Sequence, residues 1–279
     1  MQEVRMRLEG SVALVTGASA GIGRVVAGRL AAAGARLVVH GRDEQRTEAV
    51  ARATGGTPVL GDLALPGAVD AVVEAALAAH GRVDVLVANA GLGWSGPFAD
   101  MTPGELERLI AVDLLAPVQL AHRLLPAMLD RGSGHLALVG SVAGRTGVAG
   151  EAVYAAAKAA LDVFAESLRL ELTGTGVAVS LTVPGVVDTG FFAARGRAYD
   201  RGFPRPVPPE DVARAVERAI AHDRAEAWVP GWLRLAPAVR AVAPSTYRRL
   251  TARFGEQVRA RPRRADGPAG SDGQREVRP

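Results

Sequence analysis

The chain has 279 residues, of which 48% are hydrophobic and 22% charged, so it can bury the core of one large domain. It contains no cysteine, which excludes disulfides, thiolate metal ligands and a cysteine nucleophile, and we expect no metal ion at its site. The net charge is +4, but residues 259–279 hold six arginines against three acidic residues. The remainder is therefore almost neutral, and no nucleic-acid partner is expected.

No uninterrupted apolar run approaches the roughly 18 residues of a membrane span. Residues 1–8 mix charged with apolar side chains and do not form the apolar core of a signal peptide. We therefore expect a soluble, cytoplasmic protein.

Short apolar segments alternate along the chain with longer segments of helical periodicity. The near-continuous hydrophobicity of the short segments is typical of strands buried on both faces. Such βαβ alternation predicts the α/β class, with a Rossmann-type, doubly wound parallel sheet in a single domain. The predicted strands are 11–17, 35–41, 57–63, 83–91, 134–141 and 176–185.

The predicted domain spans residues 1–231 and includes a substrate cap at 190–209, where aromatic residues mix with Arg, Gly and Pro. Residues 232–258 predict a C-terminal helical extension, packed on the domain or at a subunit interface. Contact of this extension with a membrane surface is an alternative that its prolines disfavour. Residues 259–279 are polar and rich in Pro and Gly, which predicts a disordered basic tail.

The first predicted strand leads into TGASAGIG and then into a helix. Glycines permit a tight turn, and the free N–H groups and dipole of a helix N-terminus favour a pyrophosphate. Glycines often make only turns, but the strand before and the helix after indicate a dinucleotide site here. The expected contacts are Gly17, Ser19, Gly21, Ile22 and Gly23.

The second predicted strand ends at Gly41, followed by Arg42. An acidic residue at this strand end would accept the ribose hydroxyls of NAD, whereas a guanidinium binds the 2′-phosphate of NADP. We therefore predict that NADP(H) is preferred, with NAD(H) as the alternative cofactor. In that alternative, Arg42 is an ordinary surface residue and Asp43 contacts the ribose.

Lys158 is the only lysine of the chain and lies four residues after Tyr154 in a segment of high helical propensity. A nearby ammonium favours the phenolate, so Lys158 is expected to lower the pKa of Tyr154. The pair could equally be ordinary helix surface. Ser141, at the carboxyl end of the fifth predicted strand, favours a catalytic site because open α/β sheets place their sites at that edge.

Taken in order, these motifs resemble the short-chain dehydrogenase/reductase superfamily over nearly all of residues 8–231. The motifs are TGASAGIG, GDL with Asp62, ANAG with Asn89, Ser141, YAAAK, and PGVVDT with Pro184, Gly185 and Thr189. The resemblance implies that Ser141 holds a substrate carbonyl, that Tyr154 donates a proton to it, and that Lys158 also binds the nicotinamide ribose. It further implies Asp62 and Leu63 at the adenine, Asn89 and Gly91 beside the adenosine ribose, and Pro184, Gly185, Val187 and Thr189 around the nicotinamide.

Asp113 departs from the family pattern, which has an asparagine at this position in its proton relay. An ionised carboxylate only accepts hydrogen bonds, so the relay changes in detail although the reaction is expected to survive. The resemblance also implies a homodimer or homotetramer.

The expected activity is NADP(H)-dependent interconversion of a carbonyl compound and an alcohol by hydride transfer. One alternative is a non-catalytic, nucleotide-sensing regulatory protein, which would not need Ser141, Tyr154 and Lys158. A methyltransferase-like domain is another, disfavoured by Gly41 and Arg42 after the second strand. The substrate is expected to be fairly apolar, because aromatic residues lie near the predicted site: Trp94, Phe98, Phe191, Phe192 and Phe203.

Overall fold

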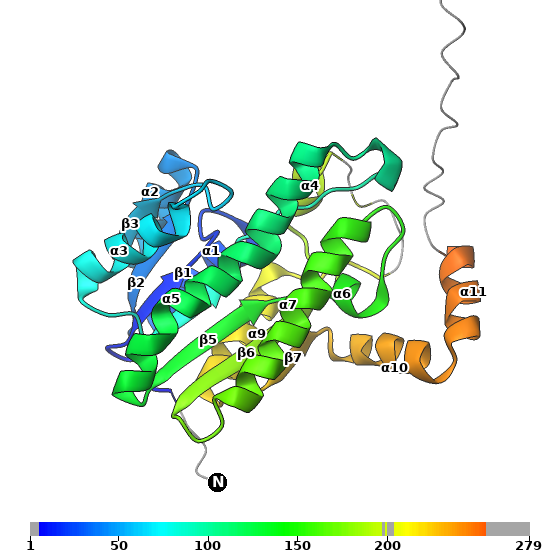
Figure 1. Cartoon of the computed structure of the whole chain (residues 1–279). Helices are drawn as coiled ribbons and strands as arrows, with labels where there is room; N and C mark the ends of the chain where they lie inside the picture. The colour runs from blue at the N-terminus through cyan, green and yellow to red at the C-terminus, as the bar shows by residue number, and fades with distance from the viewer. Residues whose placement is uncertain (1–5, 197–198, 200–203, 255–279) are drawn as a thin grey trace, which may run out of the picture.

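A computed structural model describes residues 6–196, 199 and 204–254. Its centre is a seven-stranded sheet in the order β3-β2-β1-β4-β5-β6-β7, with every pair parallel (Figure 1). The order reverses between β1 and β4, which opens a crevice at the carboxyl ends of these strands. The strands are β1 Val12–Val15, β2 Arg36–Gly41, β3 Thr57–Leu60, β4 Val85–Ala88, β5 Gly134–Val139, β6 Val177–Pro184 and β7 Glu226–Val229.

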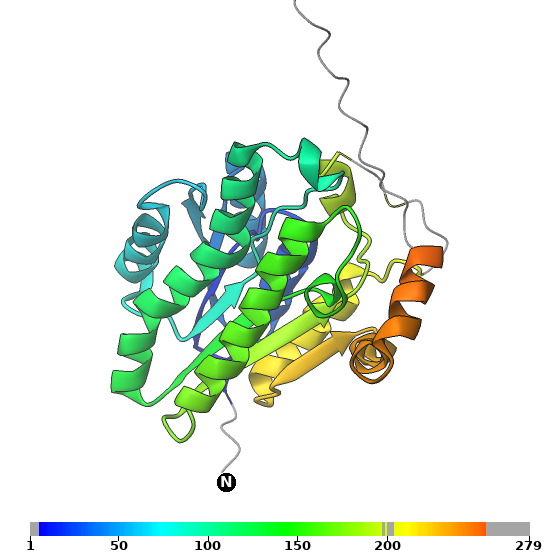
Figure 2. The same ribbon diagram turned by 45° about the vertical axis from the view of Figure 1, so that its right-hand side comes forward.

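Helices cover both faces of this sheet. Buried side chains of α3, α5 and α7 form one core with the sheet, and those of α1, α2 and α9 form a second on its other face (Figures 1 and 2). The helices are α1 Gly21–Ala32, α2 Glu44–Thr54, α3 Ala68–His80, α4 Pro103–Ile110, α5 Ala116–Arg131, α6 Val142–Thr146, α7 Ala152–Glu171, α8 Phe191–Ala194, α9 Pro209–Ala221, α10 Leu235–Val242 and α11 Pro244–Phe254.

This architecture confirms the predicted Rossmann-type class. The central strands have no exposed residue, which explains their continuous hydrophobicity in the sequence. The sequence patterns missed β7, an edge strand of four residues with only Val229 buried. A short edge strand with one buried side chain lacks the apolar run that revealed the other six.

Helices α4 and α5 are joined without a break by a π-helical turn, Ala111–Leu115. Because of this continuity, residues 103–131 form a helix long and apolar enough to cross a membrane by length and composition alone. Core helices of globular proteins pass the same test. Here Leu120, Leu124 and Met128 pack in the core beneath the sheet.

The C-terminal extension packs beside α6 (Figure 1). Arg240 donates a hydrogen bond from Nη1 to the carbonyl of Arg145 at 2.9 Å, and the Tyr247 hydroxyl donates to the carbonyl of Thr146 at 3.2 Å. Both acceptors lie in the last turn of α6, whose carbonyls have no partner within the helix. The predicted extension beyond residue 254 and the predicted tail at 259–279 lie outside the described residues.

Asp84 precedes β4, at the edge of the sheet where the strands begin, and the residue is only 9% exposed. Its carboxylate holds the amino ends of the strands together. It accepts hydrogen bonds from the backbone N–H of Val12 at 2.9 Å and from Nε of Arg82 at 3.0 Å. The guanidinium of Arg131, at the end of α5, lies 3.7 Å from its second oxygen. One buried carboxylate therefore joins β1, β4 and α5 far from the carboxyl edge.

We expect Asp84→Ala to lower the free energy of unfolding by about 2–3 kcal/mol, because it leaves a buried backbone N–H without an acceptor. Asp70→Ala is the matched control, since its ion pair with Arg123 is solvent-exposed and worth less than about 1 kcal/mol. Urea unfolding measures both. Equal losses for the two variants would contradict this role of Asp84.

Candidate active site

The glycine turn lies between β1 and α1, at the crevice where the strand order reverses. A Cβ added at Gly17 would lie 2.8 Å from the Cα of Ala90, and one at Gly23 would lie 2.3 Å from the carbonyl oxygen of Gly17. Only glycine fits these two contacts. The N-cap residue Ala20 has no capping side chain, so the first N–H groups of α1 are left for a ligand.

Asn89 holds this turn from the end of β4. Its amide nitrogen donates to the carbonyls of Thr16 at 3.0 Å and Gly17 at 3.2 Å. The hydroxyl of Thr16 in turn accepts from the backbone N–H of Asn89 and Ala90, both at 3.1 Å. The side chain of Asn89, which was predicted beside the adenosine ribose, therefore shapes the glycine turn.

Asp62 follows β3 at the predicted adenine end of the crevice. Its carboxylate accepts from Nη2 of Arg108 at 2.5 Å and from the backbone N–H of Ala64 at 3.1 Å. Burial by itself would raise the pKa of Asp62, but these hydrogen bonds and the charges of Arg108 and Arg42 together lower it. Leu63 packs its side chain in the core, so only its backbone faces a ligand.

The end of β2 has no acidic side chain at the position of Gly41. A Cβ at Gly41 would lie 2.4 Å from Oγ1 of Thr47 and 3.0 Å from Cβ of Ser19, so an acidic side chain does not fit there. The carboxylate of Asp43 caps α2 by accepting from the backbone N–H of Arg46, and it also pairs with the Arg46 guanidinium. Arg42 is exposed and makes no ion pair with the described residues.

Ser141, Tyr154 and Lys158 come together at the carboxyl edge of β5. Ser141 is the N-cap of α6 and accepts from the backbone N–H of Ala143 at 3.1 Å. Its hydroxyl also lies close enough to the phenol of Tyr154 to act on the pKa of that group. Nζ of Lys158 lies 5.9 Å from the centre of the Tyr154 ring, one turn along α7. The three side chains that the sequence suggested as one site are thus neighbours.

Asp113 lies in the π-helical turn between α4 and α5 and is fully buried. One carboxylate oxygen is 3.1 Å from Nζ of Lys158, and the other accepts from the backbone N–H of Leu92 at 2.8 Å. Nζ of Lys158 also donates to the carbonyl of Val139 at 3.2 Å. Burial raises the pKa of Asp113, and the charge of Lys158 with the Leu92 bond opposes that rise.

The expectation that Lys158 lowers the pKa of Tyr154 is wrong for the protein alone. Desolvation of the phenol raises this pKa, and the charge of Asp113 raises it further. The Ser141 hydrogen bond opposes the rise but does not overcome it. Because the ammonium of Lys158 is paired with Asp113, its attraction for a phenolate is largely compensated.

Residues 184–189 lead from the end of β6 to α8, which lies over Tyr154. The backbone N–H of Gly185 donates to the carbonyl of Val229, Val187 pairs with Val207, and Oγ1 of Thr189 accepts from the backbone N–H of Phe191 at 3.4 Å. The ring of Phe191 lies 5.8 Å from that of Tyr154.

The other aromatic residues predicted at the site include packed residues, an exposed one and one that the structure does not describe. Phe192 packs against Phe191 on α8, and the indole of Trp94 hydrogen-bonds Glu105. Phe98 is 61% exposed. Phe203, with the rest of 200–203 and residues 197–198 of the predicted cap, lies outside the described residues.

The sequence patterns missed three charged side chains at this edge. Glu151 and Arg195 form a buried ion pair between the start of α7 and the end of α8, and Arg108 binds Asp62. None of them belongs to a recognisable motif. Each is brought to the site by a contact between residues more than 40 positions apart, which local spacing does not reveal.

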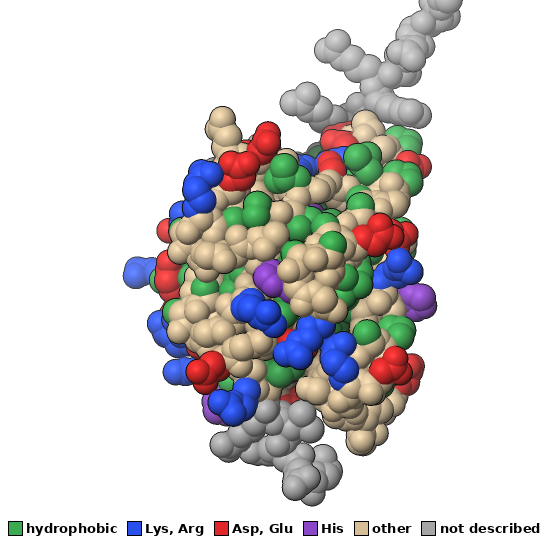
Figure 3. Space-filling model, turned by 90° about the vertical axis from the view of Figure 1, so that its left-hand side faces the viewer, with side chains coloured by type: hydrophobic (Ala, Val, Ile, Leu, Met, Phe, Trp, Pro, Cys, Tyr) green, Lys and Arg blue, Asp and Glu red, His purple; other side chains and the backbone are tan. Residues whose placement is uncertain are grey.

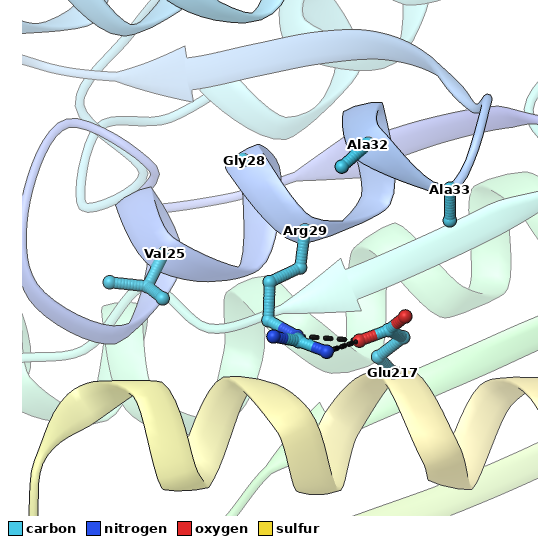
Figure 4. Close-up of a pocket in the computed structure, with 6 residues that line it drawn as sticks. All are labelled: Val25, Gly28, Arg29, Ala32, Ala33 and Glu217. Atoms are coloured by element: carbon cyan, nitrogen blue, oxygen red, sulfur yellow. Dashed lines mark hydrogen bonds and ion pairs between the residues drawn. The ribbon is translucent and has the colours of Figure 1, made fainter.

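Two other surfaces show no comparable grouping of polar side chains. A hollow of about 440 Å³ lies between α1 and α9, where Arg29 pairs with Glu217 beside the small residues Gly28, Ala32 and Ala33 (Figure 4). It is on the outer face of the helices. On the side of the molecule seen in Figure 3, basic and acidic side chains are interspersed.

The residues of the crevice fit a nicotinamide dinucleotide. The turn admits only glycine at positions 17 and 23, and no side chain caps the first turn of α1, so its N–H groups are left for a phosphate. In the strand order, the glycine turn after β1 lies between Arg42 and Asp62, which follow β2 and β3, and Lys158 with residues 184–189, beside β5 and β6. Such a site needs no metal ligand.

Comparison with known proteins agrees with this geometry. The family model described as short chain dehydrogenase matches residues 11–200. The chain therefore belongs to the short-chain dehydrogenase/reductase family of oxidoreductases.

Individual relatives extend over most of the chain. A ketoacyl reductase of Nostoc sp. is 34% identical over 275 residues, which cover 93% of this chain and 96% of the relative. A metagenomic short-chain oxidoreductase solved with NADP is 38% identical, with a TM-score of 0.69 and coverage of 80% of this chain and 98% of that one. A short-chain dehydrogenase/reductase from Burkholderia phymatum, solved with NAD, is 27% identical, with a TM-score of 0.76 and coverage of 85% and 94%.

The Asp113–Lys158 pair generates a prediction about pH. The carboxylate charge of Asp113 raises the pKa of Tyr154, so Asp113→Asn is expected to move ionisation of Tyr154 to lower pH. The amide oxygen of the new side chain can still accept the hydrogen bond from the backbone N–H of Leu92. The difference in tyrosinate absorbance between each protein and its Tyr154→Phe counterpart measures this shift. Turnover is expected to stay within about tenfold of the parent. Complete loss of turnover, or ionisation at higher pH, would contradict this account.

Proposed function

We propose that the protein is an NADP(H)-dependent oxidoreductase that interconverts a ketone or aldehyde with the corresponding alcohol. The observation that carries this proposal is the grouping of Ser141, Tyr154 and Lys158 beside the dinucleotide crevice. A site that only bound the nucleotide would not need a serine and a tyrosine side by side at its substrate end.

When bound, the reduced nicotinamide supplies the hydride for the carbonyl carbon. Ser141 and Tyr154 both direct hydroxyl groups at the carbonyl oxygen, and Tyr154 gives up its proton to that oxygen as the alcohol forms. The raised pKa of Tyr154 keeps the phenol protonated before reduction, which suits a proton donor. In the reverse direction the phenolate takes the proton from the alcohol.

Lys158 has two tasks in this proposal. Its compact ammonium is paired with Asp113 and donates one hydrogen bond, to the Val139 carbonyl, so donors remain for the ribose hydroxyls. It also stands one helical turn from the phenol that must be reprotonated. A planar guanidinium would fit this three-way arrangement poorly, which accounts for the single lysine in an arginine-rich chain.

Three features of the β2 end support NADP(H) over NAD(H). Gly41 excludes the acidic side chain that would bind ribose hydroxyls, Asp43 is engaged by α2, and Arg42 is exposed and close enough to Asp62 for its charge to act on that carboxylate. An exposed guanidinium is suited to a bidentate contact with the 2′-phosphate. Relatives solved with NADP and with NAD leave NAD(H) as the second cofactor to test.

The relatives and the site together suggest the substrate. A ketoacyl reductase is among the relatives, and Phe191 and Phe192 give the substrate end an apolar wall. We propose a fairly apolar oxo compound, handled in the cytoplasm by a homodimer or homotetramer. The regulatory alternative predicts nucleotide binding without turnover, so the two functions separate on activity alone.

Cofactor choice is tested with Arg42→Ala. We expect NADPH binding to weaken by about 10- to 100-fold, because a charge-assisted contact is lost, and NADH binding to change little. Nicotinamide fluorescence measures both. Arg46→Ala is the matched control, since this neighbouring arginine pairs with Asp43. NADH binding as tight as NADPH binding in the parent would contradict the preference.

Catalysis is tested with Tyr154→Phe. Reduction of aromatic and aliphatic ketones by NADPH is expected to fall by about 10²- to 10⁴-fold, because the proton donor is lost while the ring keeps its contact with Phe191. NADPH affinity should be retained. A variant with the parent's turnover would exclude Tyr154 as proton donor, and a parent that binds NADPH but reduces no carbonyl compound would favour the regulatory alternative.

A further inference from the structure

Arg195 is the C-cap residue of α8, the helix whose Phe191 packs on Tyr154. Its side chain is only 6% exposed. The guanidinium carbon lies 4.4 Å from the centre of the Phe192 ring, and a Cβ added at Gly93 would lie 3.1 Å from Cβ of Arg195. Since Phe191, four residues before it, packs on Tyr154, Arg195 belongs to the same wall as the proton donor.

The hydrogen bonds of Arg195 are incomplete. Nη1 donates to a carboxylate oxygen of Glu151, whose side chain is also buried. Nε is buried and has no hydrogen-bond partner among the residues that the structure describes. A buried N–H without an acceptor is unfavourable, and such a group in a native structure calls for a ligand or another explanation.

The charge of the ion pair determines whether an anionic or a neutral acceptor suits the Nε–H of Arg195. Glu151 already compensates the guanidinium, so a second anion would leave a net negative charge in a desolvated site. A neutral oxygen carries no such cost. The charges of Glu151 and Arg195 both influence the pKa of Tyr154. The guanidinium of Arg195 therefore lies within electrostatic reach of the reacting phenol.

We propose that Nε of Arg195 donates a hydrogen bond to a second, neutral carbonyl oxygen of the substrate, so that the enzyme selects oxo esters, oxo thioesters or diketones over simple ketones. The proposal rests on the proposed function and names its substrate class. One carbonyl lies at Ser141 and Tyr154, the second at Arg195, and the rings of Phe191 and Phe192 cover the apolar remainder.

The test compares ethyl esters of 2-, 3- and 4-oxo acids with simple ketones of equal length, because the spacing of the two carbonyls is to be found by experiment. The parent should prefer at least one oxo ester in kcat/KM by tenfold or more. Arg195→Lys keeps a cation for Glu151 but removes the planar second donor. It should reduce kcat/KM for the preferred ester at least tenfold more than for its matched ketone.

Glu151→Gln is the matched control, because it weakens the ion pair but retains Nε of Arg195. It should change kcat/KM for ester and ketone by similar factors. The same similar factors in Arg195→Lys would overturn the proposal and leave Arg195 a structural partner of Glu151. Absence of any oxo-ester preference in the parent would overturn it as well.

A binding measurement separates this proposal from the proposed function. Calorimetry on Tyr154→Phe with bound NADP⁺, alone and combined with Arg195→Lys, follows ester and ketone affinity without turnover. Loss of ester affinity in the double variant, at least tenfold beyond the loss for the ketone, supports the site even if the parent reduces nothing. Equal affinity for ester and ketone in Tyr154→Phe overturns it even if the parent is an active reductase.

Discussion

The contact on which the site depends is the buried pair of Asp113 and Lys158. An ammonium taken out of water is tolerated only when its charge is compensated, and Asp113 compensates it while the Val139 carbonyl accepts one of its protons. The pair also joins three elements that are separate in the sequence: the π-helical turn, β5 and α7. These contacts hold the ammonium of Lys158 one helical turn from Tyr154 on α7.

Compensation of the Lys158 charge by Asp113 also affects the proton of Tyr154. A free ammonium beside a phenol would stabilise the phenolate, whereas a paired one leaves the field of the surrounding protein to dominate. The phenol is then desolvated by its neighbours, with Phe191 across its ring, and holds its proton firmly. Such a group is prepared to donate to an oxygen that becomes basic as hydride arrives, and water is kept from competing for that role.

Much of this could be predicted from the sequence, because some physical constraints are local. Buried parallel strands need continuous apolar runs, a pyrophosphate turn needs glycines, and a pair on one helix face needs a spacing of four. The sequence could not predict the strand β7 or the pKa of Tyr154. It could not predict the ion pairs Glu151–Arg195 and Arg108–Asp62 either. Each depends on which distant side chains meet and how much water they exclude, and neither quantity leaves a periodic or motif-like trace.

The extension that packs on α6 has a consequence for the order in which the site is completed during synthesis. Ser141 begins α6, and Arg240 and Tyr247 bind the carbonyls at its other end, roughly a hundred residues later in the chain. A nascent chain whose whole Rossmann sheet has already left the ribosome still lacks these two donors. The helix carrying Ser141 gains its last partners only when α10 and α11 have left the ribosome, so an attachment that hindered their docking would disturb the active site from the far end of the polypeptide.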